Sequence, residues 1–313
     1  MDLKRSRILV IVLSLLVAAC AGDGAADDDE APTVVATTSI LGDVTQNIVG
    51  DHAEVDVLMP PGSDPHDYSA SARDVEAISS ADLVIANGLA LEESLENILQ
   101  SAESDGVTVL RVGELVDPIP FDSDSTTDPS EDQHTTDDPH FWLDPLRMRT
   151  AAEAISRALA DVAPDIDWQS AASAYEAELT ALDAEVVEIL APIPPDQRIL
   201  VTNHDALEYF ADRYGFRIAG VVIPGGSTLA EPSAADLADL VETLKELDVR
   251  AIFVENTASP VLADTVAGEL GGEVTIATLY TGSLGEADGP ASTYIGMIRE
   301  NAKTITSALA PES

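Results

Sequence analysis

The sequence predicts an α/β fold with two parallel-sheet lobes joined by a long helix. Short runs rich in β-branched residues alternate with helix-like segments in two separate series, and strands separated by helices favour βαβ units and parallel sheets. Between the two series lies a long stretch with the apolar periodicity of a helix. A chain of 313 residues, 45% of them apolar, is long enough and apolar enough to form such a core.

Residues 1–19 are expected to form a lipoprotein signal peptide. Basic residues precede the apolar run Ile8–Ala19, which is short for a membrane span and typical of the central region of a signal peptide. The run ends in "LLVAAC", which resembles the lipobox of bacterial lipoproteins, and Cys20 is the single cysteine of the chain. We therefore expect Cys20 to be lipidated and to anchor an extracytoplasmic protein to the cell membrane. An ordinary signal peptide with a chance cysteine is the alternative.

Residues 20–31 are acidic and rich in Gly and Ala, which predicts a flexible tether. The whole chain carries 57 Asp and Glu against 15 Lys and Arg, a formal net charge of −42. So acidic a surface repels nucleic acid, because it lacks the basic groups that release counterions from phosphate. Nucleic-acid binding is therefore excluded, whereas the charge alone is no sign of metal binding.

The first lobe is expected over residues 32–144. Near its end the stretch 122–138 is acidic, low in complexity and nearly without apolar side chains, which predicts a surface loop. The strands are predicted at 33–39, 55–59, 82–88 and 107–112, with helices at 40–50, 71–80 and 91–101 between them.

Residues 145–191 are expected to be helical, with an interruption near Pro164. The second part of this region carries one apolar stripe at spacings of three and four residues, which marks one face of a long helix. The second lobe is expected over residues 192–313, where Ser233 and Asp236 form the capping box of a helix. Its strands are predicted at 198–203, 217–223, 250–255 and 273–278.

Three of the five histidines fall where this fold places its sites. In open parallel sheets ligands bind beyond the carboxyl ends of the strands, and His66 and His204 each come after a predicted strand. His140 precedes the long helical region, and the sequence Asp-Pro-His occurs at both His66 and His140. Proline stiffens both turns, as suits a metal ligand that must be held in narrow geometry. The intervals of 74 and 64 residues are no local metal motif, so a structural role for each histidine stays open.

Neighbouring carboxylates are the expected partners for the second imidazole nitrogen of each histidine. Metal-binding histidines usually donate that N–H to a carboxylate or carbonyl group. The residues expected to accept it are Asp67, Asp144 and Asp205.

The stretches "GSDPHDY", "HFWLDP", "TNHDALEYFADRYGF" and "AIFVEN" resemble those of the metal-binding solute-binding lipoproteins of bacterial ABC transporters, the zinc/manganese cluster. The resemblance runs over nearly the whole mature chain. It implies two α/β lobes linked by a rigid helix, with the metal in the cleft between the lobes. It also implies His66, His140 and His204 as metal ligands, and an ABC permease with its ATPase as partners. We expect a monomer that binds a divalent metal ion and catalyses no reaction.

The resemblance favours zinc as the transported ion. A histidine at the position of His204 is typical of zinc-type members, whereas a glutamate there is typical of manganese-type members. Many members add an aspartate in a stretch resembling "LYTDSLG", but here the stretch is "LYTGSLG" and Gly282 has no side chain to offer. The fourth ligand is then a water molecule or a carboxylate from elsewhere, such as Glu286, Asp288 or the acidic loop.

Three alternatives to a zinc receptor stay open at this point. The first is a manganese receptor, or a receptor for another divalent metal, of the same type. The second is a secreted zinc hydrolase with Glu255 or Asp64 as the base, although no HExxH motif is present. The third is an extracellular adhesin.

Overall fold

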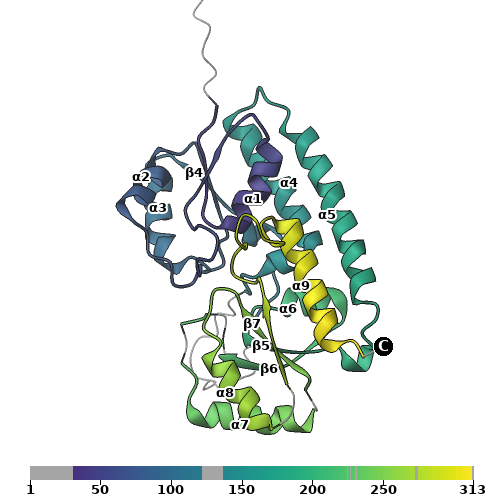
Figure 1. Cartoon of the computed structure of the whole chain (residues 1–313). Helices are drawn as coiled ribbons and strands as arrows, with labels where there is room; N and C mark the ends of the chain where they lie inside the picture. Colours follow the sequence, from purple (N-terminus) through teal and green to yellow (C-terminus); the bar gives the residue numbers. More distant parts are fainter. Residues whose placement is uncertain are drawn as a thin grey trace, which may run out of the picture. The chain divides into compact units, whose positions relative to one another are not determined.

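The fold is known from a computed structural model, which describes residues 31–311 except 122–136, 224, 226, 230, 248 and 272–273. The predicted signal peptide, nearly all of the tether and most of the acidic loop lie outside the described residues. Residues 32–313 form one compact unit that contains two four-stranded parallel sheets (Figure 1). The predicted fold class is confirmed.

The first sheet has the strand order β2-β1-β3-β4, and all three pairings are parallel. The central strands are fully buried because both faces of the sheet are covered, which explains their continuous apolar sequence. The strands are β1 (Val34–Ala36), β2 (Val55–Val57), β3 (Leu83–Ala86) and β4 (Thr108–Arg111).

The helices of the first lobe begin at residues that suit helix N-termini. The Thr38 side chain caps α1 by accepting a hydrogen bond from Leu41 N, and Ser71 forms a capping box with Asp74 at the start of α2. The helices are α1 (Ser39–Val49), α2 (Ala72–Ser80), α3 (Glu96–Ser104) and the 3₁₀ turns η1 (Glu93–Leu95), η2 (Val112–Leu115) and η3 (Phe141–Leu143).

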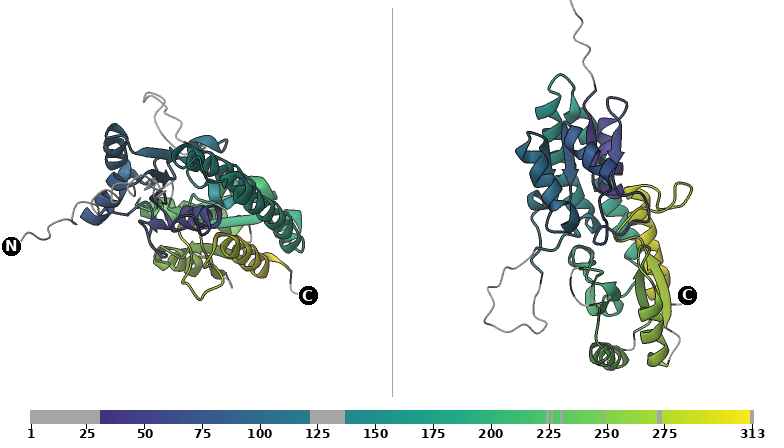
Figure 2. Two further views of the ribbon diagram at one scale, coloured as in Figure 1. Left: turned by 90° about the horizontal axis from the view of Figure 1, so that it is seen from above. Right: turned by 90° about the vertical axis from the view of Figure 1, so that its left-hand side faces the viewer.

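Two long helices come after the first lobe. Asp144 caps α4 (Pro145–Val162) through Leu146 N, with Pro145 at the first helical position, and α5 (Trp168–Leu190) begins after a short turn. The predicted break near Pro164 is therefore present. In Figures 1 and 2, α5 runs alongside α4 and α9 (Tyr294–Leu309).

The second sheet repeats the topology of the first, with the order β6-β5-β7-β8. In each sheet the chain forms a central strand, moves to one side, and then returns to the other side. Ligands bind at such reversals of strand order in α/β proteins. The elements are η4 (Pro195–Gln197), β5 (Ile199–His204), α6 (Glu208–Tyr214), β6 (Arg217–Ile223), α7 (Ala234–Glu246), β7 (Ala251–Glu255), α8 (Val261–Leu270) and β8 (Thr275–Leu279).

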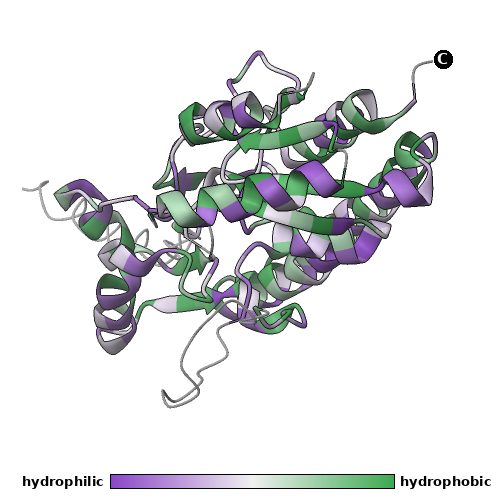
Figure 3. Ribbon diagram, turned by 90° about the horizontal axis from the view of Figure 1, so that it is seen from below, coloured by the Kyte–Doolittle hydropathy of each residue, from purple (hydrophilic) through white to green (hydrophobic). Residues whose placement is uncertain are grey.

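One continuous apolar core extends through parts of both lobes. It contains Ile40 of α1, Trp168 and Leu179 of α5, Phe253 of β7 and Tyr294 of α9, each no more than 3% exposed. Figure 3 shows the helices banded in green and purple, as expected of amphipathic helices with one buried face. Among the described residues, no helix has the length and the apolarity needed to cross a membrane.

Candidate metal centre

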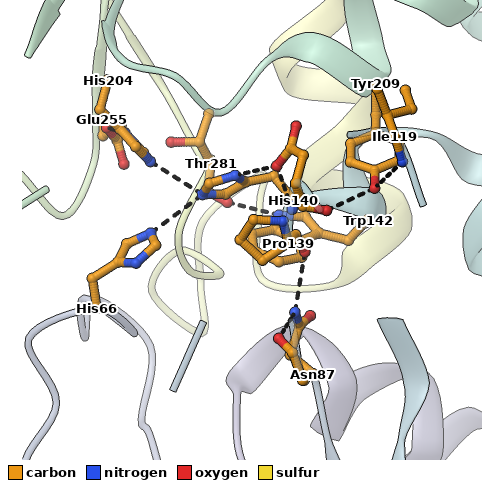
Figure 4. Close-up of polar contacts among 12 residues, drawn as sticks. His66, Asn87, Ile119, Pro139, His140, Trp142, His204, Tyr209, Glu255 and Thr281 are labelled. Atoms are coloured by element: carbon orange, nitrogen blue, oxygen red, sulfur yellow. Dashed lines mark hydrogen bonds and ion pairs between the residues drawn. The ribbon is translucent and has the colours of Figure 1, made fainter. Parts of the chain in front are cut away.

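The three candidate histidines come together in the structure. His66 lies in the loop after β2, His140 lies just before η3, and His204 is the last residue of β5. Their Nε2 atoms converge, with 3.2 Å between His66 and His140 and 3.1 Å between His204 and His140 (Figure 4). The site therefore joins residues that are 74 and 64 positions apart.

The repeated Asp-Pro-His sequence forms the same turn twice. The Asp64 carboxylate accepts a hydrogen bond from His66 N at 3.0 Å, and the Asp138 carboxylate accepts one from His140 N at 2.9 Å. A short side chain that bonds to the backbone two residues on is an Asx-type turn. The aspartate and the proline together fix the backbone from which each imidazole extends.

Two buried carboxylates orient two of the imidazoles. Asp138 Oδ1 accepts from His140 Nδ1 at 2.7 Å, and Glu255 Oε1 contacts His204 Nδ1. Asp138 is 0% exposed and Glu255 6% exposed. With Nδ1 carrying the proton, Nε2 presents its lone pair to the centre of the cluster, as metal-binding histidines require.

These partners differ from those expected from the sequence. Asp144 instead caps α4 and pairs with Arg147, and neither Asp67 nor Asp205 takes the place of Asp138 or Glu255. The prediction is wrong for His140, whose partner Asp138 lies on the other side of it in the sequence, and for His204, whose partner Glu255 is distant in sequence. Glu255 ends β7, the strand that pairs with β5, so the two strand ends bring His204 and Glu255 together.

The expectation that residues 122–138 form a surface loop is wrong for Asp138. This residue is fully buried, and its backbone carbonyl accepts a hydrogen bond from Tyr209 Oη at 2.7 Å. Tyr209 belongs to α6, and its hydroxyl also accepts from Ile119 N at 3.0 Å (Figure 4). Tyr209 of the second lobe is therefore hydrogen-bonded to Ile119, just before the acidic segment, and to Asp138, at its end.

The electrostatics of the site prepare two histidines to bind metal. Burial and then the neighbouring imidazoles lower the pKa of His66 to about 3, and the same causes lower the pKa of His140 well below its ordinary value. Both are therefore neutral near pH 7, and a neutral imidazole is the form that binds metal. Burial raises the pKa of Asp138 to about 7.

His204 and Glu255 behave as a coupled pair. Burial alone lowers the pKa of His204, but attraction to Glu255 and their hydrogen bond outweigh burial, so the pKa lies above its ordinary value. Burial alone raises the pKa of Glu255, but attraction to His204 outweighs it and the pKa is lowered. Of the three imidazoles, His204 is therefore the one that would have to lose a proton before it could bind a metal ion.

Among the described residues, the cluster of potential metal ligands contains only the three histidines. Gly282 lies beside it, and a Cβ atom added there would lie 3.1 Å from Thr257 Oγ1 and 3.4 Å from Pro65 Cδ. A small side chain at this position would need only a slight shift of its neighbours. Neither Glu286 nor Asp288 belongs to the cluster.

Direct hydrogen bonds join the two lobes around the site. Trp142 Nε1 donates to the Thr281 carbonyl at 2.7 Å. The Ser283 hydroxyl accepts from Gly62 N at 2.8 Å and lies 3.1 Å from Ser39 Oγ. The loop that contains Gly282 therefore connects the second lobe to two segments of the first.

Comparison with known proteins gives one consistent family. The family model described as ZnuA, zinc-uptake complex component A, periplasmic, matches residues 34–308. The manganese-binding lipoprotein MntA of Halalkalibacterium halodurans is 31% identical over 304 residues, covering 96% of this chain and 96% of that protein. The zinc-binding protein TroA of Treponema pallidum is 32% identical over 290 residues, covering 89% of each.

A solved structure agrees with the sequence matches. The structure of the periplasmic zinc-binding protein TroA from Treponema pallidum superposes with a TM-score of 0.79 at 32% identity, covering 90% of this chain and 99% of that one. A third relative by sequence, the iron-binding protein YfeA of Yersinia pestis, is 32% identical over 274 residues, covering 87% of this chain and 84% of that protein.

Proposed function

Because the chain belongs to the ZnuA family of metal-binding solute-binding proteins of ABC transporters, we propose that it captures Zn²⁺ outside the cell membrane and delivers it to an ABC permease. The proteins of this family bind their substrate and are not enzymes, which removes the hydrolase alternative. The ion is cargo, and His66, His140 and His204 are the proposed ligands.

The convergence of three Nε2 atoms carries this proposal. Zinc forms bonds of about 2.0–2.1 Å to histidine nitrogen, so two ligands at tetrahedral angles lie about 3.3 Å apart. The two observed separations, 3.2 and 3.1 Å, need only small adjustments to meet that distance. The Nε2 lone pairs of neutral His66 and His140 point at this centre, and Nε2 of His204 joins them once it has lost its proton, so a cation between them would have three donors.

The chemistry of the ligands favours zinc over manganese. Relatives named for manganese, zinc and iron are all about equally similar to this chain, so their names do not decide the metal. Imidazole suits zinc, whereas manganese prefers carboxylate oxygen, and the cluster of described ligands holds imidazoles alone. Glu255 places negative charge behind His204, and Asp138 accepts the Nδ1 proton of His140; both contacts strengthen the imidazoles as donors.

We infer an organisation of the chain in five parts. Residues 1–19 are removed, Cys20 carries the lipid, and residues 20–31 separate the lipid from the two lobes. The lobes comprise 32–144 and 192–313, and the helices of 145–191 connect them, in a protein that acts as a monomer. Replacing Cys20 with Ser should then release the protein from membranes into the medium, and a variant that stays membrane-bound would contradict the anchor.

Release of the ion requires only a small separation of the lobes. His66 and His140 belong to one lobe and His204 to the other, so an opening movement at the permease lengthens the bond to His204 first. The hydrogen bonds of Ser283 and Trp142 across the lobes are broken in the same movement. The ATPase would supply the energy for the cycle.

Zinc titration of the metal-stripped mature chain tests the proposal. We expect one tight site, and a loss of affinity of at least about a hundredfold when any of the three histidines is replaced with Ala. His52 is exposed and lies outside the cluster, so His52→Ala is the matched control and should bind zinc normally. Tight binding retained in all three single variants would refute the assignment.

A further inference from the structure

A second cavity lies beside the histidine cluster and shares no histidine with it. It is a groove of about 250 Å³, with residues of both lobes on its walls. The first lobe contributes Asp64 and Asp67, which flank His66 in sequence, and the second lobe contributes Asn203 and the start of α8. The groove is slightly smaller than pockets that hold drug-sized molecules.

The unsatisfied side chain of Asn203 is the main evidence that the groove binds a ligand. It is 1% exposed, it lines the groove, and neither its side-chain nitrogen nor its side-chain oxygen has a hydrogen-bond partner among the described residues. Leaving a buried amide unbonded costs free energy, because both groups lose their bonds to water. A ligand that supplies an acceptor and a donor would satisfy Asn203.

The other walls restrict the chemistry of that ligand. Apolar side chains of the second lobe cover much of the groove, which disfavours a bare hydrated ion and favours an organic molecule. The residues concerned include Ile223, Leu229, Val261 and Leu262, of which Leu229 and Val261 are more than half exposed.

Charge restricts the ligand further. Asp64 and Asp67 stand on the wall of the first lobe, so a purely anionic molecule would be repelled. On the opposite wall α8 begins at Val261, and the first N–H groups of a helix have no intrahelical acceptor and favour a negative group. The groove is therefore negative on one side and offers N–H donors on the other.

We propose that this groove binds a small zwitterionic amino acid with an apolar side chain. Its ammonium group faces Asp64 and Asp67, its carboxylate accepts from Asn203 and from the start of α8, and its side chain contacts the apolar wall. The site is distinct from the proposed zinc site and would bind its ligand in the metal-free protein.

Titration calorimetry with L-leucine on the metal-free mature chain tests the proposal. Two control probes share the apolar body of leucine: 4-methylpentanoate lacks the ammonium group, and isopentylamine lacks the carboxylate. We expect leucine to bind and both controls to bind at least about tenfold more weakly, since each loses a charge-assisted contact. Absence of leucine binding, or equal binding of 4-methylpentanoate, would overturn the proposal.

Two variants locate the binding site. Asn203→Leu removes both amide groups but keeps the branching and the number of side-chain heavy atoms, and Asp67→Asn removes one carboxylate charge. Both should weaken leucine binding at least about tenfold, while the exposed Asp105→Asn leaves it unchanged. Unchanged leucine binding in Asn203→Leu would show that the groove is not the site. Zinc titration and thermal unfolding of the same variants separate a folding defect from a loss of the ligand.

Discussion

Replacing Glu255 with Gln should weaken zinc binding without removing the ligands themselves. The Glu255 carboxylate contacts Nδ1 of His204 and directs Nε2 toward the other two histidines. The variant keeps the shape of the side chain and an acceptor oxygen but loses the negative charge. The imidazole therefore becomes a weaker donor, and its orientation is less firmly fixed.

The magnitude depends on burial. Both residues are almost inaccessible to solvent, at 2% exposed for His204 and 6% for Glu255. Solvation therefore does not compensate for the lost attraction between carboxylate and imidazole. Changes to such supporting carboxylates weaken metal affinity about 10- to 100-fold. This corresponds to about 1.4–2.7 kcal/mol of binding free energy.

Competition with a chelator of known zinc affinity measures the effect. Glu185→Gln is the matched control, because Glu185 pairs with Arg299 and lies outside the cluster, so the loss of its charge should leave zinc affinity unchanged. Glu255→Gln protein that is folded and binds zinc as tightly as the wild type would refute this account of the site.

Three further predictions concern the ligand set, the protonation of the site and the core. Gly282→Asp places a carboxylate beside the cluster and should raise manganese affinity roughly tenfold by competition assay, whereas Gly268→Asp, in open space on α8, should not. Because only the pKa of His204 is raised among the three histidines, zinc affinity should fall as the pH drops below that pKa. Calorimetry in buffers of different ionisation enthalpy at about pH 6.5 should then show about one to two protons released, from His204 and from Asp138, whose pKa is about 7, and release of three or more would contradict the neutral state of His66 and His140. Phe253→Ala should lower the free energy of unfolding by about 3–5 kcal/mol in denaturant titration, against less than about 0.5 kcal/mol for a substitution at exposed Val187.

The sequence predicted the three histidines because their positions depend on the fold. The strands of a parallel sheet all end at one edge, and His66 and His204 each follow a predicted strand, so each could be assigned to the carboxyl edge of its own sheet. His140 was a candidate because it repeats the Asp-Pro-His sequence of His66, and the resemblance to a known family then implied all three histidines as ligands. The geometry brings all three together.

The supporting carboxylates could not be predicted in the same way. Glu255 lies 51 residues from His204 and meets it through strand pairing, which no local pattern reveals. Asp138 did leave a signal, because an Asp-Pro pair before a residue favours an Asx-type turn, and the same turn precedes His66. Because its neighbours in the sequence are acidic and low in complexity, Asp138 was assigned to the surface loop and not to the site.

One helix begins later than its sequence suggests. The pattern predicts a single helix over 91–101, but Leu89 and Ala90 adopt positive φ and α3 begins only at Glu96. The buried Glu92 carboxylate accepts hydrogen bonds from Asn87 N and Gly88 N. These bonds hold a tight turn that propensity alone would not show.

The proposed zinc site consists of three imidazoles from two lobes. A calorimetric titration of zinc, and then of manganese, into chelator-stripped protein lacking residues 1–31 tests whether this site exists. We predict one tight zinc site per chain and much weaker manganese binding. Manganese binding as tight as zinc binding would contradict the assignment of the metal, and absence of stoichiometric binding of either ion would contradict the site itself.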